Sequence, residues 1–373
     1  MLRKKLSVLL AAAMVAAAVV GCGGADQAAA PADNAAPAEE AAPAEDAAPA
    51  EDAEAGDAEA GDAEAAPAAS GDVITVGYAQ VGHESDWRTA NTKNYQDVFS
   101  AANGYELSLI DCDNDNAVQL EAVRNFITQQ LDYIIIAPIE TAGWDTVLQE
   151  AQDAGIPVII ADREIDADAS LYDAWVGTNT KNEGVTAGNW LAEYLDGKEA
   201  NILVIEGSVG ASAALGRSEG FNEVAEQHSE WKILDSQSGD FTQDGGQEVM
   251  ESFIKSYEGQ FNVVVCHNDN EAYGAMDAMN AAGITYGVDG DVILISFDAT
   301  HDGLQYTLDG KINCNVECNP IQAAVVAEVI QKMQNNESYD ATTLVNDEAF
   351  VAPGIESQYA TTMTEDILAG RAY

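Results

Sequence analysis

Basic residues are scarce in this chain of 373 residues. It has 15 Lys and Arg residues against 64 Asp and Glu residues, a formal net charge of -49. Setting aside the three bases of residues 1–21 and the 13 acids of residues 22–71 leaves 51 acids against 12 bases, about −39. Binding to nucleic acid requires a basic footprint. The charge therefore argues against nucleic acid as a partner and suits an uncharged or cationic ligand.

Cysteine and histidine are also few, with five Cys and four His residues. Cys314 and Cys318 lie on one strand-like segment, roughly 13 Å apart at about 3.3 Å per residue, which is too far for a disulfide. No His spacing supports a zinc site, so we expect no metal and no cofactor. The chain has no Gly-x-Ser-x-Gly elbow, phosphate loop or metal-binding His pair. We therefore expect that it is not an enzyme.

The N-terminal residues 1–21 have the features of an export signal. Arg3, Lys4 and Lys5 precede an apolar run, residues 6–20, that is too short to span a membrane comfortably. Small residues before Cys22 resemble a bacterial lipoprotein signal, in which Cys22 becomes the lipidated first residue. The alternative is an ordinary signal peptide cut at an Ala-rich site. We expect an extracytoplasmic protein, lipid-anchored on the outer face of the membrane or periplasmic, touching the membrane through its lipid only.

The next segment lacks the large apolar side chains that form a hydrophobic core. Between residues 23 and 71 the chain has no Leu, Ile, Val or aromatic residue and consists almost entirely of Ala, Pro, Gly, Asp and Glu. Such a composition cannot offset the entropy of ordering the backbone. Residues 22–71 are therefore predicted to be a disordered acidic tether.

From residue 72 onward, strand-like runs alternate with amphipathic helix-like stretches such as residues 116–130. This rhythm predicts an α/β fold with parallel sheets and crossover helices, and about 300 residues favour two lobes. The predicted strands are residues 73–81, 105–112, 133–137, 157–162, 174–177, 201–206, 232–236, 262–267, 292–298 and 312–318.

Two buried-type strands, one in each half, end on an acid. The run 157–162 ends on Asp162, and the run 292–298 ends on Asp298. Ligands of open parallel sheets bind beyond the carboxyl ends of the strands. We therefore expect each half to present its strand ends to one cleft between two similar lobes.

Polar and aromatic residues follow several of the predicted strands. Arg, Asp and Asn next to aromatic residues suit a sugar, because charged groups bind hydroxyls strongly and an aromatic face covers the C–H side of the ring. Each residue also has an ordinary alternative. A single Arg is often solvated or caps a helix, Trp87 fits the core of the first helix, and Asp298 fits an N-cap.

Residues 72–373 resemble the pentose- and hexose-binding proteins of bacterial ABC transporters. The segments shared with that wider family are residues 161–163, 210–214 with Arg217, 267–269 and 296–298. The segments 80–88, 136–144 and 236–242 resemble the galactofuranose-binding branch in particular. Cys318, where ribose binders commonly have an amide, and Trp144, after a loop that they lack, argue against ribose.

The resemblance implies a periplasmic binding protein of type I, with two Rossmann-like lobes joined by a three-segment hinge. The lobes would comprise residues 72–178 plus 319–345 and residues 179–318 plus 346–373. Ligand contacts carried over by position are Trp87, Arg88, Asp162, Arg163, Thr178, Arg217, Phe241, Asn268, Phe297 and Asp298, with Trp87 and either Phe241 or Phe297 sandwiching the ring.

The function implied is capture of a monosaccharide, galactofuranose-like or another pentose or hexose, by a monomer that delivers it to an ABC permease. The alternative is a sensor module that presents its closed form to a chemoreceptor or a histidine kinase. A ligand-responsive transcription regulator is disfavoured by the export signal, the acidic charge and the lack of an N-terminal helix-turn-helix.

Overall fold

The computed structural model describes residues 73–373. The predicted signal peptide 1–21, the lipidation site Cys22 and the tether 22–71 lie outside the described residues. None of the helices within residues 73–373 is long and apolar enough to cross a membrane.

The first sheet consists of six parallel strands and is assembled mostly from the first hundred described residues. Its spatial order is β11 (Thr342–Leu344), β5 (Ala174–Gly177), β4 (Val158–Asp162), β3 (Tyr133–Ile136), β1 (Ile74–Gln80) and β2 (Tyr105–Asp111). Its core is shared with α1 (Asp86–Val98), α2 (Asn116–Gln129), α3 (Asp145–Ala154) and α9 (Ala323–Gln334). The 3-10 turns η1 (Ala101–Asn103) and η2 (Ala169–Leu171) lie in its loops.

The second sheet repeats this arrangement. Its order is β13 (Thr361–Thr362), β12 (Ala349–Val351), β10 (Cys314–Glu317), β9 (Ile293–Asp298), β8 (Val263–Cys266), β6 (Ala200–Glu206) and β7 (Trp231–Ser238), with only β12 antiparallel to its neighbour β10. Its helices are α4 (Thr180–Leu195), α5 (Ser212–Ala225), α6 (Gln243–Tyr257), α7 (Asp269–Ala282), α8 (His301–Leu308) and α10 (Glu365–Ala369). In both sheets the first five strands have the doubly wound order 2-1-3-4-5.

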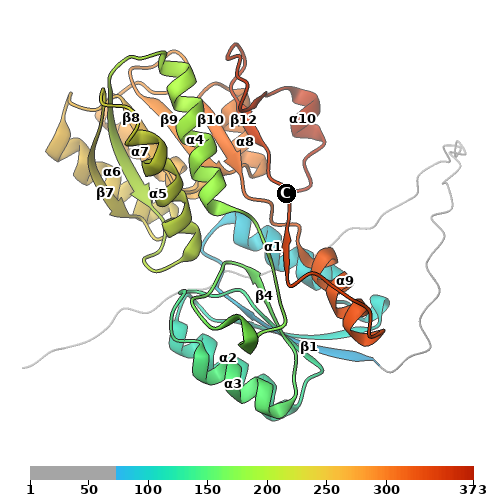
Figure 1. Ribbon diagram of the computed structural model, residues 1–373. Coiled ribbons are helices and arrows are strands. Elements are labelled where there is room, and N and C mark those ends of the chain that lie inside the picture. The colour runs from blue at the N-terminus through green and yellow to red at the C-terminus, as the bar shows by residue number, and fades with distance from the viewer. Residues whose placement is uncertain (1–72) are drawn as a thin grey trace, which may run out of the picture. The chain divides into compact units, whose positions relative to one another are not determined.

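Helices cover both faces of the second sheet, which explains why its central strands β6, β8 and β9 are mostly apolar (Figure 1). Side chains alternate between faces along a strand. Ile202 and Val204 of β6 pack in the core that α4 and α5 share, whereas Leu203 and Ile205 pack in the core that α6 and α7 share. A strand buried on both faces has no solvent side on which polar residues could alternate.

The chain passes between the two sheets three times. It leaves the first sheet after β5 and enters α4, returns after β10 to α9, and crosses again between β11 and β12. The connecting residues are 178–179, 318–322 and 345–348. These crossings place the carboxyl ends of strands from both sheets around one space.

The ten predicted strands and the helix at 116–130 are confirmed, with ends that differ by at most two residues. β11, β12 and β13 were not predicted from the sequence. They are only two or three residues long, and β11 and β13 are polar, so neither length nor alternation marks them.

Candidate ligand-binding site

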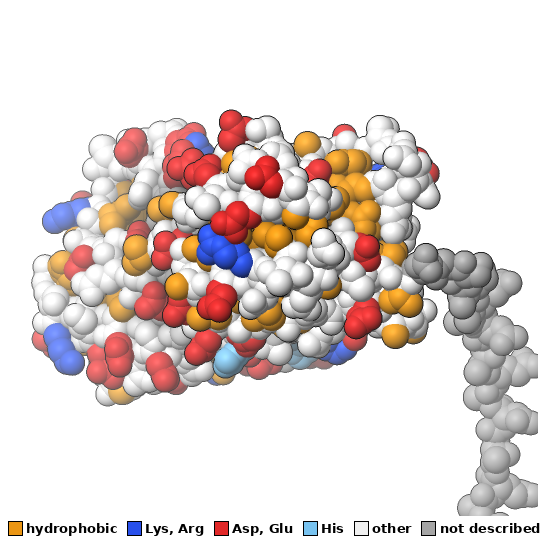
Figure 2. Space-filling view, turned by 90° about the horizontal axis from the view of Figure 1, so that it is seen from below, with side chains coloured by type: hydrophobic (Ala, Val, Ile, Leu, Met, Phe, Trp, Pro, Cys, Tyr) orange, Lys and Arg blue, Asp and Glu red, His pale blue; other side chains and the backbone are white. Residues whose placement is uncertain are grey.

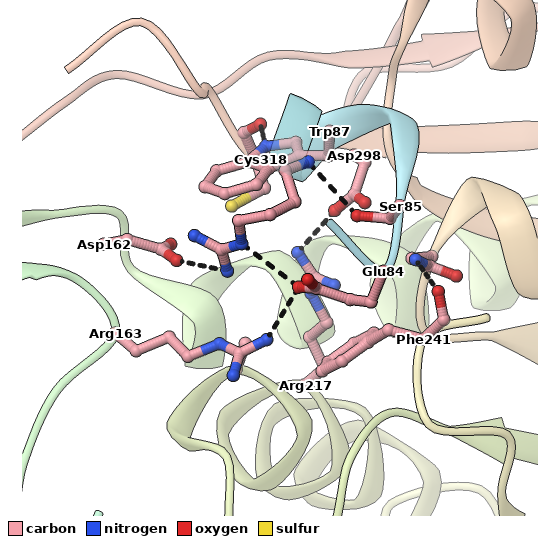
Figure 3. A pocket seen from close by; sticks show the side chains of 12 residues that line it. Glu84, Ser85, Trp87, Asp162, Arg163, Arg217, Phe241, Asp298 and Cys318 are labelled. Atoms are coloured by element: carbon pink, nitrogen blue, oxygen red, sulfur yellow. Dashed lines mark hydrogen bonds and ion pairs between the residues drawn. The ribbon is translucent and has the colours of Figure 1, made fainter. Parts of the chain in front are cut away.

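A small cavity lies where strand ends of the two sheets meet (Figure 3). The lining residues come from the segments after β1, β4, β6, β7, β8, β9 and β10, and they are Glu84, Ser85, Trp87, Arg88, Asp162, Arg163, Ala213, Arg217, Phe241, Asn268, Asp298 and Cys318.

The two strand-end acids adopt the same unusual backbone conformation. Asp162 at the end of β4 has φ +63°, and Asp298 at the end of β9 has φ +92°, although both are non-Gly residues and buried. Strained conformations of this kind persist only where the surrounding structure enforces them, and they are common at ligand-binding sites. Asp298 does not cap the next helix, because Thr300 accepts the hydrogen bond from the Gly303 amide at the start of α8.

On the first-sheet side, one carboxylate lies between two guanidiniums (Figure 3). Glu84 Oε1 lies 3.1 Å from Arg88 Nε and 3.6 Å from Arg163 Nη2, and Arg88 Nη2 lies 2.8 Å from Asp162 Oδ2. Burial alone would raise the pKa of Glu84, but Arg88 and Arg163 outweigh it and hold that pKa below its ordinary value. Glu84 is therefore an ionised bridge at neutral pH.

On the second-sheet side, Arg217 of α5 joins three elements. Its Nε donates to Glu183 Oε2 at 2.7 Å, its Nη2 donates to Asp298 Oδ1 at 3.0 Å, and its Nη1 donates to the His267 carbonyl. Burial raises the pKa of Asp298 to about 7, and Arg217 opposes this rise. The guanidinium is thus fully engaged by protein groups, and it fixes the orientation of Asp298.

Two aromatic side chains line the cavity, one from each side. The indole N–H of Trp87 donates to the Cys318 carbonyl, and the Arg88 guanidinium lies 4.6 Å from the Trp87 ring. The Arg163 guanidinium lies 5.2 Å from the ring of Phe241, which follows a strand of the other sheet. Figure 3 shows guanidiniums between the Trp87 and Phe241 rings. Trp87 is buried because it faces the cavity, rather than as a core residue of α1.

Eight of the ten residues predicted as ligand contacts line the cavity, whereas Thr178 and Phe297 do not. Thr178 lies behind Cys318, with its hydroxyl donating to Glu183 and 3.3 Å from the Cys318 thiol. Phe297 packs in the core beneath Arg217, whose guanidinium lies 5.0 Å from its ring. Of the two aromatics proposed to face Trp87, the cavity therefore contains Phe241.

Four lining residues were not predicted as contacts: Glu84, Ser85, Ala213 and Cys318. Glu84 and Ser85 stand in the segment 80–88 with Arg88, but the sequence gives no sign that the distant Arg163 also lies beside Glu84. Cys318 was singled out only as a departure from ribose binders. It is unpaired and buried, as are Cys112, Cys266 and Cys314.

Hydrogen bonds close the rim of the cavity between segments of the two sheets. Asp86 at the start of α1 exchanges two hydrogen bonds with Asn270 of α7. The Glu164 amide donates to Ser212 Oγ at 2.8 Å, and the Thr141 amide donates to the Gly210 carbonyl at 3.0 Å. All of these contacts lie in loops or first helical turns beside the cavity, so opening the cleft would break them.

The cavity offers no unpaired positive charge. Its three guanidiniums, Arg88, Arg163 and Arg217, each lie within 4 Å of a carboxylate from the set Glu84, Asp162, Glu183 and Asp298. The exterior is acidic as well, and in Figure 2 acidic side chains are spread over the face shown with few basic ones among them. An anionic ligand would be repelled both on approach and in the site.

The free energy of unfolding is expected to rise as the pH falls from about 8 to about 5. Burial raises the pKa of Asp269 to about 6, of Asp298 to about 7 and of Asp347 to about 8. The folded state then binds more protons than the unfolded state over this range. Each such group raises the free energy of unfolding by at most about 1.4 kcal/mol for every pH unit that the pH falls. The gain ends near pH 4, because the same carboxyls then take up protons in the unfolded chain as well.

Urea unfolding of the ligand-free protein at several pH values tests this expectation. Repulsion between surface acids would also make the protein more stable as the pH falls. The experiments are therefore done in about 0.5 M salt, which screens this repulsion. Asp298→Asn should flatten the dependence between about pH 4 and 7. A stability that is constant from pH 5 to 8, or highest at pH 8, would contradict the expectation.

Two parallel doubly wound sheets around a strand-end cavity are the architecture of periplasmic binding proteins. Residues 76–338 match the sequence profile of the family described as periplasmic binding protein domain, so the chain belongs to this family. Its relatives are binding proteins, and it is not an enzyme. Membership of the family implies an extracytoplasmic location.

Several similar proteins are named for a sugar or were solved with one bound. The galactofuranose-binding protein YtfQ of Escherichia coli (strain K12) is 40% identical over 266 residues, which cover 70% of this chain and 83% of YtfQ. A Mycobacterium smegmatis protein in complex with β-D-fucofuranose is 41% identical, with TM-score 0.71, covering 74% of this chain and 91% of that one. The periplasmic component of the arabinose ABC transporter of Shewanella sp. ANA-3, bound to α- and β-L-arabinofuranose, is 36% identical, with TM-score 0.71 and coverages of 74% and 92%. The predicted resemblance to the galactofuranose-binding group is confirmed.

Proposed function

We propose that this protein captures a neutral monosaccharide in its furanose ring form and delivers it to an ABC permease. The observation that carries the proposal is the cavity in which every guanidinium is already paired with a carboxylate. A ligand there gains by hydrogen bonding and not by charge. Sugar hydroxyls donate to carboxylates and accept from guanidiniums at the same time, so paired charges suit them.

The furanose form is supported by the relatives. Galactofuranose, fucofuranose and arabinofuranose are named for three similar proteins, and these sugars share a five-membered ring while differing in their other groups. Trp87 and Phe241 would cover the two apolar faces of such a ring. Asp162, Arg163, Asn268 and Asp298 would bind its hydroxyls.

Isothermal titration tests the proposal directly. We expect heat of binding with arabinose, galactose or fucose, weaker binding of ribose, and at least about hundredfold weaker binding of galactonate and galactose 1-phosphate, whose charge finds no partner. The NMR spectrum of bound ¹³C-labelled galactose should show the furanose ring. Tight binding of galactonate without binding of any neutral sugar would refute the proposal.

We further propose that residues 72–178 plus 319–345 and residues 179–318 plus 346–373 move as two lobes about the three connecting segments. The rim contacts Asp86–Asn270 and Glu164–Ser212 would then form only in the closed state, which the sugar stabilises by binding it more tightly. A lipidated Cys22 would tether the monomer beside the permease. The alternative is that the closed form of the same two lobes is presented to a chemoreceptor or a histidine kinase.

A further inference from the structure

The backbone under the Phe241 ring is strained. Asp240 has φ +56° and Phe241 has φ +61°, so two successive non-Gly residues adopt the left-handed conformation. For a bulky residue this is rare and costs free energy that other contacts must offset. The ring lies where it does only as long as those contacts hold.

Two side chains at the start of α7 hold the Phe241 peptide from both ends. The Phe241 amide donates to Glu271 Oε1 at 2.9 Å, and Asn268 Nδ2 donates to the Phe241 carbonyl at 2.9 Å. Asn268 is itself fixed, because its Oδ1 accepts from the Glu271 amide as the N-cap of α7. Asn268 lines the cavity, whereas Glu271 does not.

Glycines leave room for this arrangement. A Cβ on Gly207 would lie 1.9 Å from Phe241 Cζ, so the ring rests directly on the backbone after β6. A Cβ on Gly239 would lie 3.0 Å from Glu271 Oε1. The Phe241 ring and the Glu271 carboxyl therefore occupy the spaces that side chains at positions 207 and 239 would fill if these residues were not glycine.

Glu271 is a costly residue for a purely structural position. Its side chain is fully buried, no cation pairs with it among residues 73–373, and its Oε2 has no hydrogen-bond partner there. Burial raises the pKa of Glu271 well above its ordinary value. A buried carboxyl with one unpaired oxygen destabilises the fold.

We propose that Glu271 is a positioning residue for ligand binding, which holds the strained Phe241 peptide so that the ring faces the cavity and Arg163. The inference deepens the proposed function, since the ring is taken to cover one face of the sugar. Glu271 acts on Phe241 through the hydrogen bond that it accepts from the Phe241 amide. An amide at this position should therefore serve equally well.

The test compares Glu271→Leu, which fills the space without an acceptor, with Glu271→Gln, which keeps one. Titration with galactose should give a dissociation constant about tenfold to a hundredfold higher for Glu271→Leu and within about twofold of the parent for Glu271→Gln. Glu248→Leu, on the exposed side of α6, is the control and should bind as the parent does. Gly207→Ala should reproduce the loss with Glu271 intact.

A double-mutant cycle assigns the effect to the Phe241 ring. Glu271→Leu should cause no further loss of affinity in the Phe241→Ala protein, because residues that act through one group are not additive. Losses that add in full would show that Glu271 acts elsewhere and would overturn the proposal. So would a Glu271→Leu protein that melts at a lower temperature but binds galactose normally.

A measurement without sugar keeps this proposal separate from the proposed function. In protein labelled with 4-fluorophenylalanine, the ¹⁹F resonance of Phe241 should shift and broaden in Glu271→Leu and remain as in the parent in Glu271→Gln. If no sugar binds but the resonance responds in this way, the proposed ligand is wrong and the positioning role stands. An unchanged resonance in Glu271→Leu refutes the positioning role.

Discussion

The Arg217→Met protein is expected to bind no sugar measurably and to lose about 3–5 kcal/mol of its free energy of unfolding. Arg217 is buried and pairs with Glu183 and Asp298, two carboxylates that are themselves buried. Met replaces the aliphatic stem but leaves both acids without a cationic partner. Removing one member of a buried ion-pair network is costly because an uncompensated charge remains.

Urea unfolding and titration with arabinose measure the two losses. Adding Glu183→Gln and Asp298→Asn to Arg217→Met should restore much of the stability, because no charge is left unpaired, without restoring binding. Arg124→Met is the matched control, since Arg124 is about half exposed and its pair with Glu150 should contribute at most about 1 kcal/mol. A destabilisation by Arg217→Met of under 1 kcal/mol would contradict the role assigned to its ion pairs.

Arg163→Ala should weaken sugar binding about a hundredfold while changing the free energy of unfolding by less than about 1 kcal/mol. Arg163 makes long contacts with the protein, 3.6 Å to Glu84 Oε1 and 3.3 Å to the Ile139 carbonyl. Burial and the neighbouring Arg88 lower its pKa, so the folded protein gains little from its charge. A ligand would complete its hydrogen bonds, and a buried donor left without its partner costs affinity.

The conservative variant sharpens this expectation. Arg163→Lys keeps the charge but cannot present a planar fork to a hydroxyl and to the Phe241 ring together, so it should still lose at least tenfold in affinity. Affinity is measured by titration and stability by urea unfolding of the same preparations. Near-normal binding by Arg163→Ala would remove Arg163 from the site, and a large fall in stability would show that it is structural.

Local pattern was enough to predict most of the fold. Runs such as 157–162 and 292–298 are apolar because helices cover both faces of a sheet, and this signal lies within six or seven residues of sequence. The short strands β11–β13 escaped prediction because pairing with a neighbour, and not their own pattern, makes them strands.

The site was predictable in part for the same reason. Asp162, Arg163 and Asp298 follow buried strands directly, and strand ends of a parallel sheet meet at one edge. Phe297 also stands at a strand end, but side chains alternate between faces, so it points into the core beneath Arg217 while Asp298 faces the cavity. Sequence position alone did not distinguish the two.

The sequence by itself determined the α/β class, the acidic charge and the strand-end acids, because these depend on composition and on spacings of a few residues. Only the tertiary structure decided that Glu84 bridges Arg88 and Arg163, that Arg217 joins Glu183 to Asp298, and that Phe241 rather than Phe297 lines the cavity. These partners lie up to about 115 residues apart. They meet because the chain crosses three times between two sheets, and no local pattern records which ends then face each other.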